Sequence, residues 1–411
     1  PLDRAIDQLN TTGHAPNIAF FAGHNTIRSA VMGSTNRAPT AAELERMKAM
    51  VDTAMRAGAI GLSTGLRYVP GIYSKTEEVI ALAKVAAGHG GIYASHIRDE
   101  GAGSFEAVAE VIRIAREARL PAQVSHHKLM GQPQWGQSVR TLAMVDSARA
   151  QGLDVTIDQY AYDATSTGTA VLFPAWALAG GRDSLRSRLA NPQLRRQIEA
   201  GIRETIVEER GGGDLSRIRI ASFRPNPGWN GKTFADIARE RGRAPTLDFG
   251  AELAIEIQQQ GGASGVWHVI DEGDLRRIMQ HPFTMVSSDG DIGVLGHAHP
   301  HPRNYGAFAR VLGRYVREEK VLSLEEAVRK MTSLPASRIG QPERGRIAEG
   351  AYADIAVFDP ARITDRATYE HPHQFSVGVE YVLINGVLVL NSASLTGEKP
   401  GRVLLRAIPK S

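Results

Sequence analysis

The sequence predicts an α/β protein in which parallel strands alternate with helices, followed by a smaller β-rich domain. Short apolar runs recur along the chain without strict polar–apolar alternation, which is typical of strands buried on both faces. Segments with helix signals separate the runs, and this order favours parallel strands joined by right-handed crossovers. The six runs are 17–23, 59–63, 91–95, 122–125, 155–158 and 283–287.

The segments between the runs carry clear helix signals. Capping boxes, in which Ser or Thr is followed three residues later by Glu, predict helix starts at Thr40, Ser74 and Ser323. Gly58 should end the first of these helices, because glycine readily adopts the left-handed conformation after a helix. A further helix is expected over residues 138–150.

The β-then-α order breaks between residues 163 and 282, which we interpret as a long insertion without a clear strand. From residue 345 short alternating strands follow, with Asn385-Gly386 as a tight hairpin turn. We therefore expect a catalytic barrel over 1–344, including the insertion, and a small β-rich domain over 345–411. Since a closed (β/α)8 barrel needs eight strands, the six runs fit an open sheet or a barrel whose first two strands precede residue 1.

Charge and composition narrow the classes of function. The 411 residues carry a formal net charge of +4, and the sequence has no run of Lys and Arg of the kind that binds nucleic-acid phosphates. We therefore expect no nucleic-acid partner. No apolar run approaches the roughly 18–20 residues of a membrane helix, so no membrane association is expected. The lack of cysteine excludes disulfides, thiolate ligands and a cysteine nucleophile from these residues, and it fits a cytoplasmic protein.

Polar side chains follow the apolar runs at the point where each run ends. His96 follows the third run, His126 the fourth and Tyr160 the fifth, while Ser288 and Asp289 follow the sixth. In a parallel barrel the carboxyl ends of all strands lie on one face, so these groups should converge. Imidazole is a good zinc ligand, and a carboxylate can bind metal or accept a proton. We therefore predict that His96, His126 and Asp289 share a metal ion whose bound water ionises near neutral pH.

Each candidate also has a plainer interpretation. A strand-end histidine can be structural, and Asp289-Gly290 can be a simple turn. Arg303 could grip a carboxylate through two parallel hydrogen bonds or be a solvated surface residue. Tyr160 could orient the same carboxylate or pack in the core, and Lys128 could contact a polar substrate side chain or be solvated. The three histidines within 297–301 lie in a proline-broken segment, so we expect no metal ligation by them.

Five motifs together resemble the D-aminoacylase (N-acyl-D-amino-acid deacylase) family of the amidohydrolase superfamily. They are STGLRYVPGIYSKTEE at 63–78, SHIRDE at 95–100, SHHK at 125–128, SSDGD at 287–291 and HPHPRNYGAFARVLGRYV at 299–316. Each motif is weak alone, but five in the right order are specific. The resemblance extends from about Gly23 to Gly386.

The resemblance implies an eight-stranded barrel with a small β-sandwich and one or two zinc ions. It implies that His96 and His126 are metal ligands, that Asp289 is the catalytic acid/base, and that 163–282 contains a mobile insertion over the active site. The residues expected to face the substrate are Arg303, Tyr160, Lys128 and Ser288.

The chain departs from the family pattern at its beginning. The family's first strand carries a His-x-His pair and its second strand a further ligand, often Cys. No His-x-His precedes His24, and there is no Cys. We therefore expect these ligands in a segment ahead of Pro1.

The expected reaction is zinc-dependent hydrolysis of an N-acyl-D-amino acid, a small-molecule partner, to a D-amino acid and a carboxylate. Two alternatives remain open: a cyclic amide hydrolase of the dihydroorotase or hydantoinase type, and an inactive barrel remnant with a binding role. The acyl group, the preferred D-amino acid and the oligomeric state are not indicated by the sequence.

Overall fold

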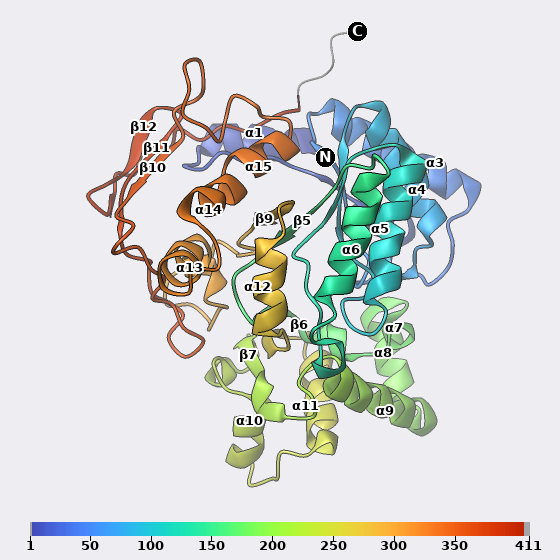
Figure 1. Ribbon diagram of the computed structural model, residues 1–411. Coiled ribbons are helices and arrows are strands. Elements are labelled where there is room, and N and C mark those ends of the chain that lie inside the picture. Colours follow the sequence, from blue (N-terminus) through green and yellow to red (C-terminus); the bar gives the residue numbers. More distant parts are fainter. Residues whose placement is uncertain (1, 407–411) are drawn as a thin grey trace.

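A six-stranded parallel sheet forms the centre of the computed structural model, which describes residues 2–406 (Figure 1). Every neighbouring pair of its strands is parallel. The strands, in spatial order, are β1 (Ala22–Gly23), β2 (Gly61–Gly65), β3 (Ile92–His96), β4 (Ala122–Val124), β5 (Val155–Gln159) and β9 (Thr284–Val286). All six predicted strands are confirmed, although β1 is much shorter than its apolar run. Because β5 pairs directly with β9, the long segment between them leaves the order of the sheet intact.

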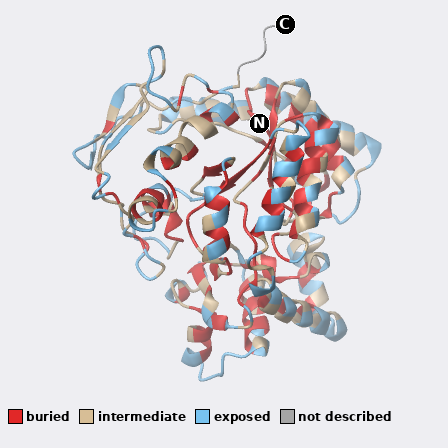
Figure 2. Cartoon of the chain, viewed as in Figure 1, coloured by how far each residue is buried: buried red, intermediate tan, exposed pale blue. Residues whose placement is uncertain are grey.

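Helices cover this sheet and bury one apolar face against it. Figure 2 shows the buried residues concentrated on the strands and on the helix faces turned toward them. One core cluster joins Met47, Val79 and Val108 to strand residues such as Leu62 and Val124. The helices of this part are α1 (Leu2–Thr12), α2 (His24–Met32), α3 (Ala41–Arg56), α4 (Thr76–Gly88), α5 (Ser104–Ala118), α6 (Ser138–Ala150), α12 (Glu272–Gln280), α13 (Arg303–Arg310), α14 (Leu324–Met331) and α15 (Ser333–Arg338).

Two of the three capping residues predicted from the sequence cap a helix in the structure. Thr40 and Glu43 cap α3 reciprocally, and the Ser323 side chain accepts a hydrogen bond at the start of α14. The box predicted at Ser74 is wrong, because α4 starts at Thr76 without a side-chain cap. Ser74 instead donates its hydroxyl to the Gly71 carbonyl at 2.6 Å, which closes a short 3₁₀ turn ahead of the helix.

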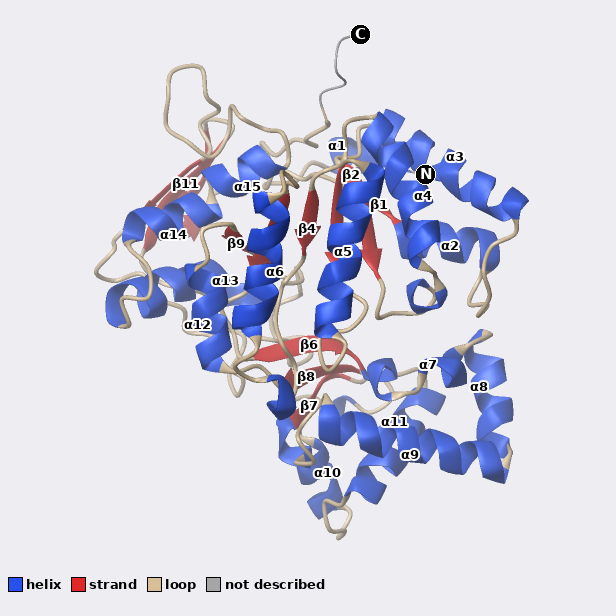
Figure 3. Ribbon diagram, turned by 45° about the vertical axis from the view of Figure 1, so that its right-hand side comes forward, coloured by secondary structure: helices blue, strands red, loops and turns tan. Residues whose placement is uncertain are grey.

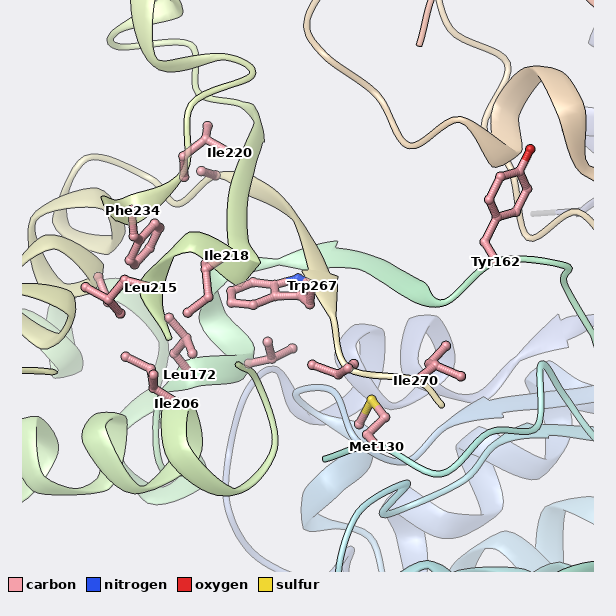
Figure 4. Packing of buried hydrophobic residues seen from close by; sticks show 14 of the residues in the cluster. Met130, Tyr162, Leu172, Ile206, Leu215, Ile218, Ile220, Phe234, Trp267 and Ile270 are labelled. Atoms are coloured by element: carbon pink, nitrogen blue, oxygen red, sulfur yellow. The ribbon is translucent and has the colours of Figure 1, made fainter. Parts of the chain in front are cut away.

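The insertion contains a three-stranded antiparallel sheet that the sequence interpretation missed. Its order is β6-β8-β7, and it lies beyond one end of the parallel sheet (Figure 3). The strands are β6 (Ala164–Gly168), β7 (Ile218–Ser222) and β8 (Ser264–His268). The helices around them are α7 (Ala175–Leu178), α8 (Gly181–Ala190), α9 (Pro192–Glu208), α10 (Phe234–Glu240) and α11 (Leu247–Gln259). Trp267, Phe234 and Ile206 belong to a second core cluster here (Figure 4).

The last part of the chain forms a four-stranded antiparallel sheet on the opposite side of the molecule from α5 and α6 (Figure 1). Asn385 and Gly386 both have positive φ and join its two longest strands, so the predicted hairpin turn is confirmed. Its strands are β10 (Ile355–Phe358), β11 (Val379–Ile384), β12 (Val387–Asn391) and β13 (Ser394–Leu395). Among residues 2–406, no helix has the length and apolar character that crossing a bilayer requires.

Candidate metal centre and substrate site

Two histidines and a glutamate meet at the carboxyl ends of β3 and β4. His96 is the last residue of β3, His126 follows β4, and Glu100 lies in the loop after His96. The Nδ1 atom of His96 lies 2.9 Å from Nε2 of His126, and Nδ1 of His126 lies 3.2 Å from Oε1 of Glu100. One ligand atom from each residue can be chosen so that all three lie within 4.8 Å of one another. Adjacent parallel strands therefore bring the two predicted histidines together.

This cluster has the features of a cation site. Within the described chain, Nε2 of His96 is buried and has no hydrogen-bond partner. A buried polar atom without a partner is costly, so its lone pair indicates a missing ligand. Burial holds the pKa of His96 well below its usual value, which favours the neutral, metal-binding imidazole. Two imidazoles and a carboxylate at this spacing fit a divalent ion.

Glu100 is the member of the cluster that the sequence interpretation missed. The HIRDE motif could have indicated Glu100, because it places a carboxylate four residues after His96. Glu100 does not follow an apolar run directly, however, so the strand-end pattern did not include it. Lys128 donates a hydrogen bond to Glu100 at 2.5 Å and another to the His126 carbonyl at 2.8 Å. Burial alone would raise the pKa of Glu100, but the Lys128 ammonium beside it brings that pKa well below its usual value. Lys128 is thus turned toward the cluster.

Asp158 on β5 supports His126 from behind. Its Oδ1 accepts hydrogen bonds from the His126 backbone at 2.8 Å and from Ser287 Oγ at 2.7 Å, and Gln123 donates to its other oxygen. His126 has a φ of 38°, which is unfavourable for a residue with a side chain. The Asp158 carboxylate therefore holds the strained backbone of His126, a candidate ligand, in place. The sequence interpretation did not assign this role to Asp158.

Asp289, Arg303 and Tyr160 form a second group beside the cluster. Oδ2 of Asp289 lies 2.8 Å from Nη1 of Arg303, and the Asp289 side chain is 38% exposed. The Arg303 guanidinium lies over the Tyr160 ring, 4.7 Å from its centre. The Tyr160 ring is 6.5 Å from that of His126, and the Lys128 ammonium is 5.5 Å from the ring centre of Tyr160. Tyr160 therefore lies close both to Arg303 and to the His126 side of the cluster.

The structure thus brings the sequence-predicted residues to one rim, but in a different grouping. Among the described residues, the three-ligand cluster consists of His96, Glu100 and His126, and Asp289 is not a member. The Asp289 carboxylate pairs with Arg303 instead. Ligation of the ion by Asp289 stays a prediction.

The remaining candidates have local roles. Ser288 Oγ accepts a hydrogen bond from the Gly290 backbone at 3.3 Å, as in a turn. Nε2 of His299 lies 2.6 Å from the Tyr369 carbonyl, and Nε2 of His301 lies 3.0 Å from the Ala164 carbonyl. These loop histidines fix the backbone that carries Arg303.

The inserted sheet forms one wall of the site through β6. The Ser166 carbonyl accepts a hydrogen bond from Arg303 at 3.4 Å. Thr167 hydrogen-bonds the hydroxyl of Tyr68 at 3.3 Å, and the Tyr68 ring lies 4.6 Å from that of His96. Residues of the insertion therefore contact Arg303 directly and approach His96 through Tyr68.

Comparisons with known proteins place these observations in a family context. The sequence profile of the amidohydrolase family matches residues 2–390. The chain is 38% identical to an N-acyl-D-glutamate deacylase of Alcaligenes xylosoxydans xylosoxydans over 390 residues, which is 95% of this chain and 70% of the relative. It is also 38% identical to a D-aminoacylase of the same organism over 402 residues, 98% of this chain and 72% of the relative.

Among solved structures, the chain is similar to an N-acyl-D-glutamate deacylase from Bordetella bronchiseptica. The TM-score is 0.82 at 37% identity, covering 98% of this chain and 75% of that chain. That protein was crystallised with zinc and a phosphonate inhibitor that mimics the tetrahedral intermediate of its reaction. The match confirms the fold class predicted from the sequence, an α/β amidohydrolase fold with a separate β-domain.

Proposed function

Because this chain belongs to the amidohydrolase family, whose profile matches residues 2–390, we propose that it hydrolyses the amide bond of N-acyl-D-amino acids. The family match and the deacylase relatives confirm the enzyme class, a metal-dependent hydrolase. The observation that carries the substrate proposal is the convergence of two groups, because the His96–Glu100–His126 cluster lies beside the Asp289–Arg303 pair. The products are a D-amino acid and a carboxylic acid.

In this proposal His96, Glu100 and His126 hold zinc, as one ion or as part of a pair. The unpartnered Nε2 of His96 and the lowered pKa of that imidazole support it, as does the zinc in the Bordetella bronchiseptica relative. When bound, zinc polarises the acyl carbonyl and lowers the pKa of a coordinated water to about 7.

Asp289 acts as the general base and acid. It is exposed enough for a substrate to reach, and its ion pair with Arg303 fixes its position. Water adds to the acyl carbon while Asp289 takes one of its protons. Asp289 then delivers that proton to the amide nitrogen as the C–N bond breaks.

Arg303 and Tyr160 bind the α-carboxylate of the substrate. In residues 2–406, Nε of Arg303 and the hydroxyl of Tyr160 are buried and have no hydrogen-bond partner. Burial raises the pKa of Tyr160 well above its usual value, so its hydroxyl stays protonated and can donate. Because the α-carboxylate is held on one side of the scissile amide, only one configuration at the α-carbon fits, and the site selects one enantiomer of the substrate. Lys128 and Ser288 remain proposed substrate contacts.

The test is an assay of the zinc-loaded protein with N-acetyl-D- and N-acetyl-L-amino acids beside hydantoin and dihydroorotate. We expect turnover of the D-substrates, with the L-enantiomers and the cyclic amides disfavoured. Preferred opening of a cyclic amide would support the hydantoinase-type alternative, and zinc binding without any turnover would support the binding-protein alternative. A cytoplasmic location stays a prediction from the lack of cysteine.

A further inference from the structure

The segment between Asp289 and Arg303 is an exposed loop with an apolar centre. It has no regular secondary structure, and every residue of the stretch 289–298 is exposed. The side chains of Ile292, Val294 and Leu295 are 97%, 67% and 55% exposed. Large apolar side chains that stand together on a surface indicate that another apolar group covers them. Contact with water is unfavourable for such side chains, so this loop can gain free energy by binding an apolar group.

The loop crosses from the parallel sheet to the insertion. Its first residue, Asp289, comes after β9 of the sheet, and its far end is fixed at His299. The His299 backbone N–H donates a hydrogen bond to the Ala221 carbonyl on β7 of the insertion at 2.7 Å. The sheet and the insertion both contribute residues to the candidate site, so the loop that joins them borders this site.

The backbone of the exposed stretch favours a change of conformation on binding. Asp289 and Ala298, at its two ends, have φ values of 48° and 63°, a left-handed conformation that residues with a side chain adopt at a cost. Gly290, Gly293 and Gly296 lie between them, and a Cβ at Gly293 or Gly296 would meet no atom within 4 Å. Glycine allows a wide range of backbone angles, so the stretch can bend toward the site while its ends stay fixed.

The part of the substrate nearest to the loop is the acyl group. In the proposed binding mode Arg303 and Tyr160 hold the α-carboxylate, and these residues are only 6% and 2% exposed. The Asp289 side chain, which delivers the proton to the amide nitrogen, is 38% exposed. The amino-acid half of the substrate therefore points into the protein, and the acyl half points outward to the start of the loop.

We propose that Ile292, Val294 and Leu295 close over the acyl group of the substrate, so that the chain prefers N-acyl-D-amino acids whose apolar acyl chain is longer than acetyl. This inference rests on the proposed function. Closure removes the three side chains and the acyl chain from water, and the gain grows with the number of methylene groups covered. An acetyl group offers a single methyl group, so it gains least from the loop.

Kinetics with two acyl lengths test the proposal. The wild type should have a higher kcat/KM for N-hexanoyl-D-alanine than for N-acetyl-D-alanine. A triple variant that combines Ile292→Ser, Val294→Ser and Leu295→Ser should lower this ratio roughly 10- to 100-fold, as expected for exposing about two or three methylene groups. Ile347→Ser is the matched control and should keep the ratio, because it changes an isoleucine that is 90% exposed in the segment before β10.

The same variants separate the acyl group from the side chain of the amino acid. The triple variant should keep the wild-type ratio of kcat/KM between N-acetyl-D-leucine and N-acetyl-D-alanine. A change confined to that ratio would assign the loop to the amino-acid side chain and contradicts the proposal. A triple variant that keeps the hexanoyl preference overturns the proposal. If that variant also elutes as a smaller species in size-exclusion chromatography, a second copy of the chain covers the loop instead.

Binding of the carboxylate product tests the loop without turnover. We expect hexanoate to raise the melting temperature of the zinc-loaded protein more than acetate does, and the triple variant should lose this difference. Without ligand the triple variant should melt near the wild type, because the three side chains are exposed. An equal shift by both carboxylates in the wild type contradicts the proposal. If the wild type hydrolyses none of the substrates, the proposed function fails, and the carboxylate experiment still decides the role of the loop.

Discussion

The parallel sheet and the inserted region meet at the candidate site, but they contribute to it in different ways. The sheet supplies His96 and His126 from adjacent strand ends, where parallel pairing forces them together. The insertion supplies the polar strand β6, which contacts Arg303, Tyr68 and Arg210. Because β5 pairs directly with β9, the insertion can change without moving the strand ends that carry the proposed metal ligands. We infer that the chemistry is set by the sheet and the selectivity by the insertion.

The largest effect should come from the ligands on the sheet. His126→Ala removes a cluster member, and we expect zinc retention to be lost and kcat/KM to fall roughly 10³-fold or more, because metal activation contributes several kcal/mol. Metal analysis after dialysis and steady-state kinetics measure both. His297→Ala, in the exposed loop, is the matched control and should retain zinc. Normal zinc content in the His126→Ala protein would show that the cluster is not the metal site.

The next effect concerns the acid/base. Asp289→Asn keeps the shape of the side chain but removes its proton affinity, so kcat should fall about 10²- to 10⁴-fold. Zinc content should stay near that of the wild type, because Asp289 lies outside the three-ligand cluster. Asp291→Asn, two residues along the same exposed loop, should have little effect on kcat. Loss of zinc in Asp289→Asn would instead assign Asp289 to the metal, as the sequence interpretation first suggested.

A smaller effect should come from the support behind His126. Asp158→Asn weakens the hydrogen bond to the strained His126 backbone, and we expect zinc affinity to fall about 10- to 100-fold, as for other residues that orient metal ligands. Competition with a chelator measures the affinity. Asp154 directly precedes β5, at the end away from the cluster, and pairs with Arg338. The control variant Asp154→Asn should leave zinc affinity unchanged. Equal losses in both variants would point to general destabilisation of β5.

The same two regions differ in how far the sequence predicts them. The strands of the sheet are buried on both faces, so each reads as an apolar run, and the polar residues after it mark the rim. β6 reads ATSTG, which has too little apolar character to be recognised as a strand. Its strand conformation depends on pairing with β8, which lies about a hundred residues away in the sequence.

Glu100 and Arg210 were missed for a related reason. Glu100 stands in a loop, where sequence spacing does not fix direction, and only the fold turns it toward His96. Arg210 follows a helix whose sequence looks solvated, and its burial comes from the packing of the insertion. Contacts between regions distant in sequence therefore decide the parts of the site that local patterns leave open.

The smallest effects are expected from the same Thr→Ala substitution at two helix starts, one beside the parallel sheet and one in the insertion. Capping boxes start α3 beside the sheet and α10 in the insertion, through Thr40 with Glu43 and Thr233 with Asp236. Thr40→Ala and Thr233→Ala should each cost about 1 kcal/mol. Because α3 and α10 pack in separate core clusters, we expect amide hydrogen exchange to rise around α3 in the first variant and around α10 in the second.

The two caps should also separate the two contributions to function. Thr233→Ala loosens the insertion, so it should weaken discrimination between N-hexanoyl-D-alanine and N-acetyl-D-alanine while zinc affinity stays unchanged. Thr40→Ala should leave that discrimination intact, since α3 packs mainly on α2, α4 and β1. If Thr233→Ala lowers zinc affinity as much as discrimination, the insertion and the sheet act as one unit, and the division of chemistry from selectivity is wrong.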